Sequence, residues 1–388
     1  MKKNDLYLAE LIRSQLEGRT PQPIPDEVDI DDLKKIAVKN HITYMVFSAL
    51  LKAPNLPKES IEQLRNPVMR CLFKTMEQVQ EIKAIEECFE KNGIINQPLK
   101  GACMKFIYPS PEMREMSDVD IWINEKSFEL AKEKLKERGY SLERSVKHHD
   151  IYCKQPYMVL EAHRAIYDKT VDKKQAEYFS IFSRAVLRPG CKYTYDFNID
   201  DFYIYMIAHM AKHFYVRGCG IRNLVDIYVY LNRFGNEMNR EYLTKEFKKL
   251  HLDSFVIHCE KLVDVWMNEK NDEEFYDNLF DYMVSGGIYG KDENGIWHKF
   301  SEKMQEDKKI SRFRLKMWYT FPPLSYMSEY YPWLEKMPVL LPIAWEIRAF
   351  RGIFLKKGKY KRKMIKSIQQ DEIGKYRDIY QRMGLNFR

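Results

Sequence analysis

The chain has 388 residues, of which 45% are hydrophobic and 31% charged, so it is long enough for more than one domain and ordinary in composition for a globular protein. No apolar run approaches the roughly 18 residues that a membrane-spanning helix needs, which argues against an integral membrane protein. The net charge of +8 is concentrated in residues 347–366, where nine Lys or Arg and no acidic residue occur, so the rest of the chain carries a net charge of −1.

The cysteine content and the first residues of the chain bear on where in the cell the protein resides. The seven Cys are odd in number and include no C-x-x-C pair, a pattern that favours reduced thiols over a disulfide framework. The first 15 residues contain no long apolar core and carry acidic residues early, unlike a secretory signal. We therefore expect a cytoplasmic protein.

Residues 1–92 have the apolar spacing of helices. Apolar residues recur three and four positions apart over residues 5–16 and 31–51, where Asp31 or Asp32 is positioned to cap the second helix. Residues 58–92 predict a long helix that Pro67 kinks or splits and that ends at Asn92-Gly93. His41 is expected inside the second helix, buried or half-buried.

Residues 93–190 alternate strand and helix patterns. We expect a strand near residues 94–98, a helix from Ala102 to Tyr108, a strand over 117–123 and a helix over 127–138. Two further strands, 146–154 and 157–166, are separated by a turn at Gln155-Pro156. His148 and His149 are adjacent and point to opposite faces of their strand, so we do not expect them to share a metal.

The strand over residues 117–123 carries the most informative pattern. Asp118 and Asp120 alternate with apolar residues, so both carboxylates point to the same face of the strand. Two buried carboxylates repel each other and lose hydration, and a divalent cation such as Mg²⁺ compensates for both costs. The simpler alternative is a strand edge whose acids face water.

A basic and glycine-containing turn precedes the Asp pair. Lys100-Gly101 follows the short apolar run 93–99 and opens a helix, where a glycine lets a phosphate approach the backbone and Lys100 adds positive charge. Arg114 follows before Asp118. The order Lys-Gly, Arg, Asp-x-Asp indicates a site for phosphate and metal.

These motifs resemble the uncharacterised bacterial nucleotidyltransferase family of the polymerase-β-like superfamily. In that superfamily a Gly-Ser or similar turn binds the triphosphate, an Asp-x-Asp strand holds two Mg²⁺, and a later strand supplies a third acid. The resemblance implies that Asp118, Asp120 and Glu161 are catalytic and hold the metal, with His163 on the face of Glu161. It also implies that Lys100, Gly101 and Arg114 contact the nucleotide. Ala102 stands where the superfamily usually has Ser.

Residues 196–290 are predicted to be helical. His209 and His213 lie four residues apart on one helix face, and residues 218–226 resemble a second signature of the family. The resemblance implies that His209, Arg222 and Asp226 line the cleft. A hydrogen-bonded structural cluster is the alternative, and no Glu follows His209 as it does in metalloproteases.

The resemblance covers most of the chain and predicts an α+β fold, with a small mixed-sheet nucleotidyltransferase core embedded in a mostly helical protein. We expect an N-terminal helical region over residues 1–92, the α/β core over 93–195, a helical domain over 196–290 and a C-terminal helical region with a basic tail over 291–388. Tyr330, Tyr331 and Trp333 are expected to pack rather than to form a stacking surface.

The function that the resemblance implies is an enzyme that moves a nucleoside monophosphate from an NTP to a hydroxyl acceptor with two Mg²⁺ or Mn²⁺ ions. The acceptor is a protein, an RNA end or a small molecule. One alternative is a catalytically inactive nucleotide-binding or scaffold member of the fold, for which Ala102 argues. The other is a nucleic-acid-binding protein organised around the basic segment 347–366.

Overall fold

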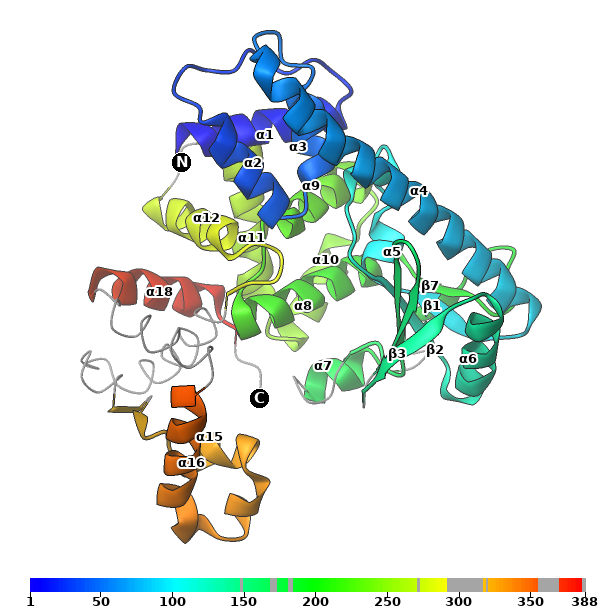
Figure 1. Cartoon of the computed structure of the whole chain (residues 1–388), viewed down its shortest axis with the longest axis vertical. Coiled ribbons are helices and arrows are strands. Elements are labelled where there is room, and N and C mark those ends of the chain that lie inside the picture. Colours follow the sequence, from blue (N-terminus) through cyan, green and yellow to red (C-terminus); the bar gives the residue numbers. More distant parts are fainter. Residues whose placement is uncertain are drawn as a thin grey trace. The chain divides into compact units, whose positions relative to one another are not determined.

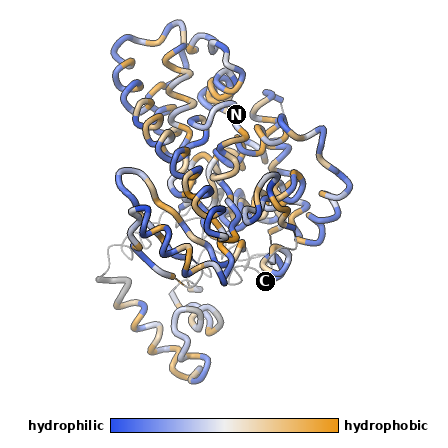
Figure 2. The backbone as a smooth tube through the Cα atoms, turned by 90° about the vertical axis from the view of Figure 1, so that its right-hand side faces the viewer, coloured by the Kyte–Doolittle hydropathy of each residue, from blue (hydrophilic) through white to orange (hydrophobic). Residues whose placement is uncertain are grey.

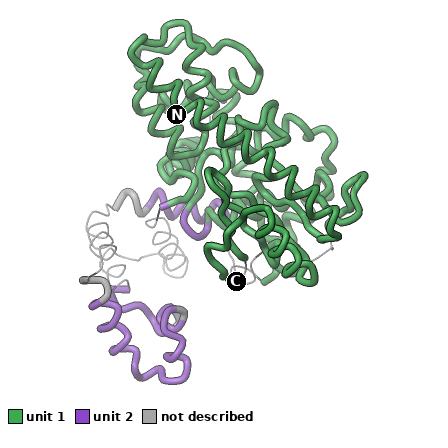
Figure 3. Tube along the Cα trace, turned by 45° about the vertical axis from the view of Figure 1, so that its right-hand side comes forward, with its two compact units in different colours: residues 1–214, 218–290, 384–388 green, residues 215–217, 291–383 purple. Residues whose placement is uncertain are grey.

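A computed structural model gives the fold of the protein. It describes residues 1–146, 149–167, 173–180, 184–270, 273–291, 317–318, 320–354 and 370–385. The chain forms two compact units, one of residues Met1–Phe214, Gly218–Gly290 and Gly384–Arg388, and the other of Tyr215–Arg217 and Lys291–Met383 (Figure 3). Residues 355–366, which hold most of the basic segment, and His148 lie outside the described residues.

Four helices form the N-terminal part of the first unit: α1 (Lys3–Leu16), α2 (Ile30–Lys39), α3 (Thr43–Leu50) and α4 (Ile61–Lys91). Helix α3 packs against both α1 and α4. Hydrophobic and hydrophilic residues alternate along the helices, as expected for elements with one buried side (Figure 2).

Three details of these helices differ from the sequence predictions. The predicted helix over 31–51 is interrupted between α2 and α3, because His41 adopts a positive φ of 53° that no α-helix allows. Asp29 caps α2, by accepting hydrogen bonds from the amides of Asp31 and Asp32. Helix α4 continues through Pro67 without being split.

The sheet has five strands in the order β1-β2-β5-β4-β3, with bounds β1 (Asn96–Pro98), β2 (Val119–Ile123), β3 (Ser141–Ser145), β4 (His149–Lys154) and β5 (Met158–His163). Strands β2 and β5 are parallel, and the other pairs are antiparallel. A separate hairpin joins β6 (Ala185–Leu187) to β7 (Tyr195–Phe197). The mixed sheet within a mostly helical chain confirms the predicted α+β class.

One face of this sheet packs into a hydrophobic core. Val119, Ile121, Leu160 and Ala162 project from β2 and β5 into a cluster with side chains of α4 and of α6 (Phe128–Glu137). Figure 1 shows α4 and α6 beside the sheet. Because side chains alternate along a strand, the opposite face of β2 and β5 carries the intervening residues.

Further helices complete the first unit: the one-turn α5 (Gly101–Met104), α7 (Lys173–Tyr178), α8 (Ile199–Arg217), α9 (Arg222–Phe234), α10 (Arg240–Lys249), α11 (Asp253–Met267) and α12 (Glu274–Gly286). Helix α11 packs on α1, α9, α10 and α12, and its Trp266 is fully buried. The helical pattern predicted for residues 196–290 is confirmed. No helix in the described part of the chain has the length and hydropathy that crossing a membrane requires.

The second unit has its own small core. The described helices are α15 (Leu324–Tyr330), α16 (Leu341–Phe354) and α18 (Gln370–Met383), with the short turns Pro332–Glu335 and Pro338–Leu340 between α15 and α16. Met327, Tyr331, Leu334 and Ala344 are buried together, and Trp333 packs against them. The aromatic residues of this segment therefore serve mainly in packing, although Tyr330 is exposed.

Candidate active site

The acidic face of the sheet is built by two neighbouring parallel strands. Asp118 directly precedes β2 and Asp120 lies within it, and the register of β2 and β5 pairs Asp120 with Glu161 and Trp122 with His163. Since paired residues project to the same side of a sheet, Asp118, Asp120, Glu161 and His163 share the face opposite the hydrophobic core. The structure thus brings together the three acids that the sequence singled out.

Lys100 supplies the nearest positive charge. Its Nζ lies 2.6 Å from Oδ1 of Asp120, and Nε2 of His163 lies 2.7 Å from the same oxygen. Burial raises the pKa of Asp120, but the charge of Lys100 and the hydrogen bond to His163 outweigh it and hold that pKa well below its usual range. Asp120 is therefore ionised at neutral pH.

Asp118 has the opposite behaviour. Burial, together with the negative charge of Asp120, raises its pKa to about 6. The two carboxylates thus titrate far apart, as expected when like charges share a site with one nearby cation. A divalent cation at this face would remove the repulsion and ionise Asp118, so the oxygen donors of Asp118, Asp120 and Glu161 fit the Mg²⁺ that the sequence implies.

The backbone at the turn before the site is constrained. Lys100 has φ 50° and ψ −120°, a left-handed conformation that side chains other than glycine adopt at a cost. A Cβ added to Gly101 would lie 2.8 Å from the Met116 side chain, so the close approach of Met116 requires glycine there. The predicted helix over 102–108 is shortened to the one-turn α5.

His149, which was not expected to share a metal with its neighbour His148, lies on the acidic face. The register of β4 and β5 pairs His149 with His163, and their ring centroids lie 5.1 Å apart. Nε2 of His149 lies 3.9 Å and Nε2 of His163 3.4 Å from Oε2 of Glu161. The partners of His149 in this site are not adjacent to it in the sequence. Glu161 and His163 lie on the next strand, and the register of the β4–β5 hairpin across Gln155-Pro156 brings them to His149.

Arg114 and Asp226 bind each other. Nε and Nη2 of Arg114 donate to the two carboxylate oxygens of Asp226 at 2.8 and 2.9 Å, and the Tyr108 hydroxyl donates to Asp226 at 2.7 Å. Both charged groups are buried, with 6% and 3% of their surfaces exposed. The guanidinium that the sequence assigned to phosphate is thus engaged in a buried ion pair linking the loop before β2 to α9.

Arg222 lies beside Arg114, and both guanidinium groups donate to the carbonyl oxygen of Glu115. Nη1 of Arg222 donates at 3.0 Å, and within the described part of the chain its buried Nε has no acceptor. Burial and the charge of Arg114 lower the pKa of Arg222 to about 10. The positive charge of Arg222 lowers the pKa of Asp118, and the charge of Asp118 raises the pKa of Arg114, so both guanidinium groups interact electrostatically with the acidic face.

His209 projects from α8 toward the same region. Its Nε2 lies 3.0 Å from Nε2 of His213, one turn further along the helix. Burial lowers the pKa of His209 well below its usual value, and the nearby charges of Lys100 and His163 lower it further. The imidazole of His209 is therefore neutral and close to Lys100.

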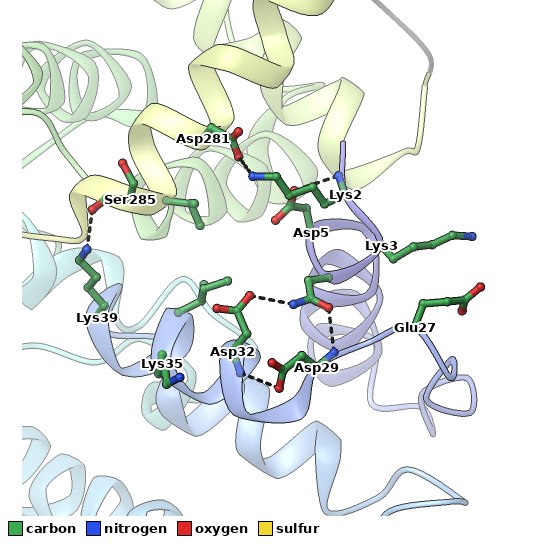
Figure 4. A pocket seen from close by; sticks show the side chains of 13 residues that line it. Lys2, Lys3, Asp5, Glu27, Asp29, Asp32, Lys35, Lys39, Asp281 and Ser285 are labelled. Atoms are coloured by element: carbon green, nitrogen blue, oxygen red, sulfur yellow. Dashed lines mark hydrogen bonds and ion pairs between the residues drawn. The ribbon is translucent and has the colours of Figure 1, made fainter. Parts of the chain in front are cut away.

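A pocket of about 500 Å³ lies elsewhere, between α1, α2 and α12 (Figure 4). Some of its polar side chains bind one another: Lys2 pairs with Asp281 at 2.7 Å, and Asn4 donates to Asp32 at 2.7 Å. The acidic sheet face, where carboxylates of two strands gather beside Lys100 and two histidines, is the stronger candidate for the active site.

The candidate site thus has two acids at one strand and a third on its parallel neighbour, beside a lysine. A family model described as uncharacterised nucleotidyltransferase matches residues 26–268, more than half of the chain. The chain belongs to this family. The matched segment contains the whole acidic face, Lys100 and the Arg114–Asp226 pair. Neither the curated proteins nor the solved structures contain a match to the chain.

Proposed function

We propose that the protein is an Mg²⁺- or Mn²⁺-dependent enzyme that transfers a nucleoside monophosphate from an NTP to a hydroxyl acceptor. The observation that carries this proposal is the convergence of Asp118, Asp120 and Glu161 on one sheet face beside the Lys100 ammonium group. A protein that only bound a nucleotide would not need three carboxylates at the place where its phosphates lie, because they repel the phosphates unless cations intervene.

In this proposal Asp118, Asp120 and Glu161 hold the divalent cations. When bound, two such ions stabilise the attacking and leaving oxygens of an in-line displacement. The acceptor oxygen bonds to the α-phosphorus, the bond from that phosphorus to the bridging oxygen breaks, pyrophosphate leaves, and the hydroxyl proton passes to a base at the carboxylate face. His163 orients Asp120 and Glu161 through contacts to both.

Lys100 and Arg222 bind the phosphates in this proposal. Lys100 sits at the edge of the acidic face, and its ammonium group can turn from Asp120 to a phosphate oxygen once a cation neutralises Asp120. Arg222 takes the role that the sequence gave to Arg114, because Arg114 is held by Asp226. His209, neutral and near Lys100, lies where it can donate or accept a hydrogen bond.

The test compares a double variant with a matched control. Asp118→Asn with Asp120→Asn should abolish Mg²⁺-dependent binding of ATP, GTP, CTP and UTP in isothermal titration, and with it any transfer of α-labelled NMP. The control is Glu129→Gln with Glu133→Gln, two exposed acids of α6, which should bind as the native protein does. Unchanged Mg²⁺–NTP affinity in the Asp variant would refute the metal role.

The same titration addresses the inactive alternative. Ala102 is buried in the position where the superfamily usually has Ser, so its side chain provides no hydroxyl for a phosphate. Mg²⁺–NTP binding by the native protein, without transfer to any protein, RNA or small-molecule hydroxyl, would favour a nucleotide-binding or scaffold role.

A further inference from the structure

Three side chains beside the Asp pair form a cluster with nitrogen as well as oxygen donors. His149 comes from β4, and Glu161 and His163 come from β5. The register pairs His149 with His163, and Glu161 precedes His163 by two residues, so all three point to one face of the sheet. One ligand atom from each lies within 4.8 Å of the other two.

The spacing of these atoms is close to that of a metal-binding site. Oε2 of Glu161 lies 3.4 Å from Nε2 of His163 and 3.9 Å from Nε2 of His149. Ligands bound at about 2.0–2.1 Å in a tetrahedral site lie roughly 3.4 Å from each other. The two separations from Glu161 are therefore close to tetrahedral spacing, and every pair of the three ligand atoms lies within 4.8 Å.

The cluster is also accessible. The side chains of His149, Glu161 and His163 are 26%, 20% and 13% exposed, so water and ions reach them while they remain partly desolvated. Asp120 contacts the cluster only as a partner of His163, whose Nε2 lies 2.7 Å from its Oδ1, so water would complete the coordination of an ion held by the three side chains.

The donor set determines which ions fit. Mg²⁺ prefers six oxygen ligands in a strict octahedron, whereas imidazole suits Zn²⁺, Fe²⁺, Co²⁺ and related ions. We propose that His149, His163 and Glu161 form a binding site for one divalent transition-metal ion of the Zn²⁺ class, next to the oxygen-only position at Asp118 and Asp120. The inference deepens the proposed function, because Glu161 is also one of the three carboxylates that we propose to hold the catalytic cations. The role of Glu161 in the reaction rests on that proposal. The metal site itself is tested without nucleotide.

The experiment uses Co²⁺ as a visible probe on the full-length protein without an affinity tag. After dialysis against a chelator, titration with Co²⁺ should give a saturable d–d absorption at one equivalent. Zn²⁺ should abolish this absorption stoichiometrically, whereas Mg²⁺ in hundredfold excess should leave it in place. Lack of a saturable band, or its displacement by equimolar Mg²⁺, would overturn the proposal.

Variants assign the ligands. His149→Gln should weaken Zn²⁺ binding at least tenfold in competition with a chromophoric chelator, and the isosteric Glu161→Gln should do so independently. The control His251→Asn changes an exposed histidine in the turn between α10 and α11 to a residue that tolerates its positive φ, and should bind like the native protein. Far-UV circular dichroism checks that each variant is folded. Native affinity in both ligand variants would place the ion elsewhere and refute the site.

The outcomes separate this inference from the proposed function. Co²⁺ binding that depends on His149, together with no Mg²⁺–NTP binding, would uphold the metal site and reject the nucleotidyltransferase proposal. Mg²⁺–NTP binding and transfer without any His149-dependent Co²⁺ binding would uphold the nucleotidyltransferase proposal and reject the metal site. Asp118→Asn should retain the Co²⁺ signal, because Asp118 is not among the three ligands.

Discussion

The residues of the acidic face conflict electrostatically in the absence of a cation. Asp120 gains two partners, Lys100 and His163, whereas Asp118 is partly buried and its pKa is raised to about 6 by that burial and by Asp120. A carboxylate with a raised pKa destabilises the folded state when it ionises. Such a site trades stability for the capacity to bind a cation.

The first prediction follows from the sign of this shift. Because the folded pKa of Asp118 exceeds its unfolded value of 3.8, folding loses stability as pH rises through this interval, and the loss is complete above about pH 7. In metal-free buffer, Asp118→Asn should therefore be more stable than the native protein by roughly 3 kcal/mol at pH 8. The advantage should shrink toward zero near pH 4, as measured by urea unfolding across this range. A difference in unfolding free energy between the two proteins that does not change with pH would contradict this prediction.

The second prediction concerns the backbone of Lys100. Both Lys100→Ala and Lys100→Gly remove the ammonium group from Asp120, but only glycine adopts φ 50° and ψ −120° without strain. Lys100→Gly should therefore be more stable than Lys100→Ala by about 1 kcal/mol in urea unfolding. At Lys132, within helix α6, the same pair of substitutions should give the opposite order, with alanine more stable by about 1 kcal/mol. If alanine is the more stable replacement at Lys100 as well as at Lys132, the backbone at Lys100 is not strained.

At the scale of elements, the sequence predicts the strands and turns that depend on neighbouring residues. The strand at Val119–Ile123 follows from its β-branched apolar residues, and the turn at Gln155-Pro156 joins β4 to β5, whose parallel pairing with β2 places Glu161 opposite Asp120. The break between α2 and α3 was not predictable in this way. Asn40 fixes it by donating to the carbonyl of Val284 and accepting from the amide of Ile221, two contacts that span more than 180 residues.

The same distinction holds for the site. Alternation along β2 was enough to predict that Asp118 and Asp120 share a face. No local signal indicated that Arg114 would pair with Asp226, because 112 residues separate them and either charge alone resembles a binding residue. His149 was missed because its position depends on the register of a strand pair, which the sequence predicts only to within a residue or two.

The third prediction tests how the sheet is held. Phe89 of α4 is fully buried in the core beneath the acidic face, whereas Phe73 of the same helix is 57% exposed. Phe89→Ala should lower the free energy of unfolding by about 3–4 kcal/mol, because it removes a buried ring and leaves a cavity. Phe73→Ala is the matched control and should change it by less than about 0.5 kcal/mol. An equal loss in both variants would contradict the assignment of this stability to packing on the sheet, because alanine has the higher helix propensity at both positions.

At the scale of the whole molecule, charge is distributed very unevenly. Residues 347–366 carry nine positive charges and no negative one, and the remainder of the chain has a net charge of −1. The described part of this segment, up to Phe354, belongs to α16. The acids that we propose to hold the cations lie in the first unit, and the basic segment lies in the second.

The last prediction asks whether the basic segment selects a polyanionic acceptor. Phosphate contacts release counterions, so the logarithm of RNA affinity should fall with the logarithm of salt by a slope of roughly −0.7 per neutralised phosphate of a single strand. Replacing Lys359, Lys361, Arg362 and Lys363 by Gln should weaken RNA binding and flatten that slope by up to about 3, while Mg²⁺–NTP binding stays unchanged. Gel-shift titrations at several salt concentrations measure the first effect and calorimetry the second. The matched control replaces Lys126, Lys132, Lys136 and Arg144 of the first unit, which removes equal charge outside the segment. If the native protein binds no RNA at low salt, or if both quadruple variants lose affinity equally, the basic segment does not select the acceptor, and a protein or small-molecule hydroxyl is then the better candidate.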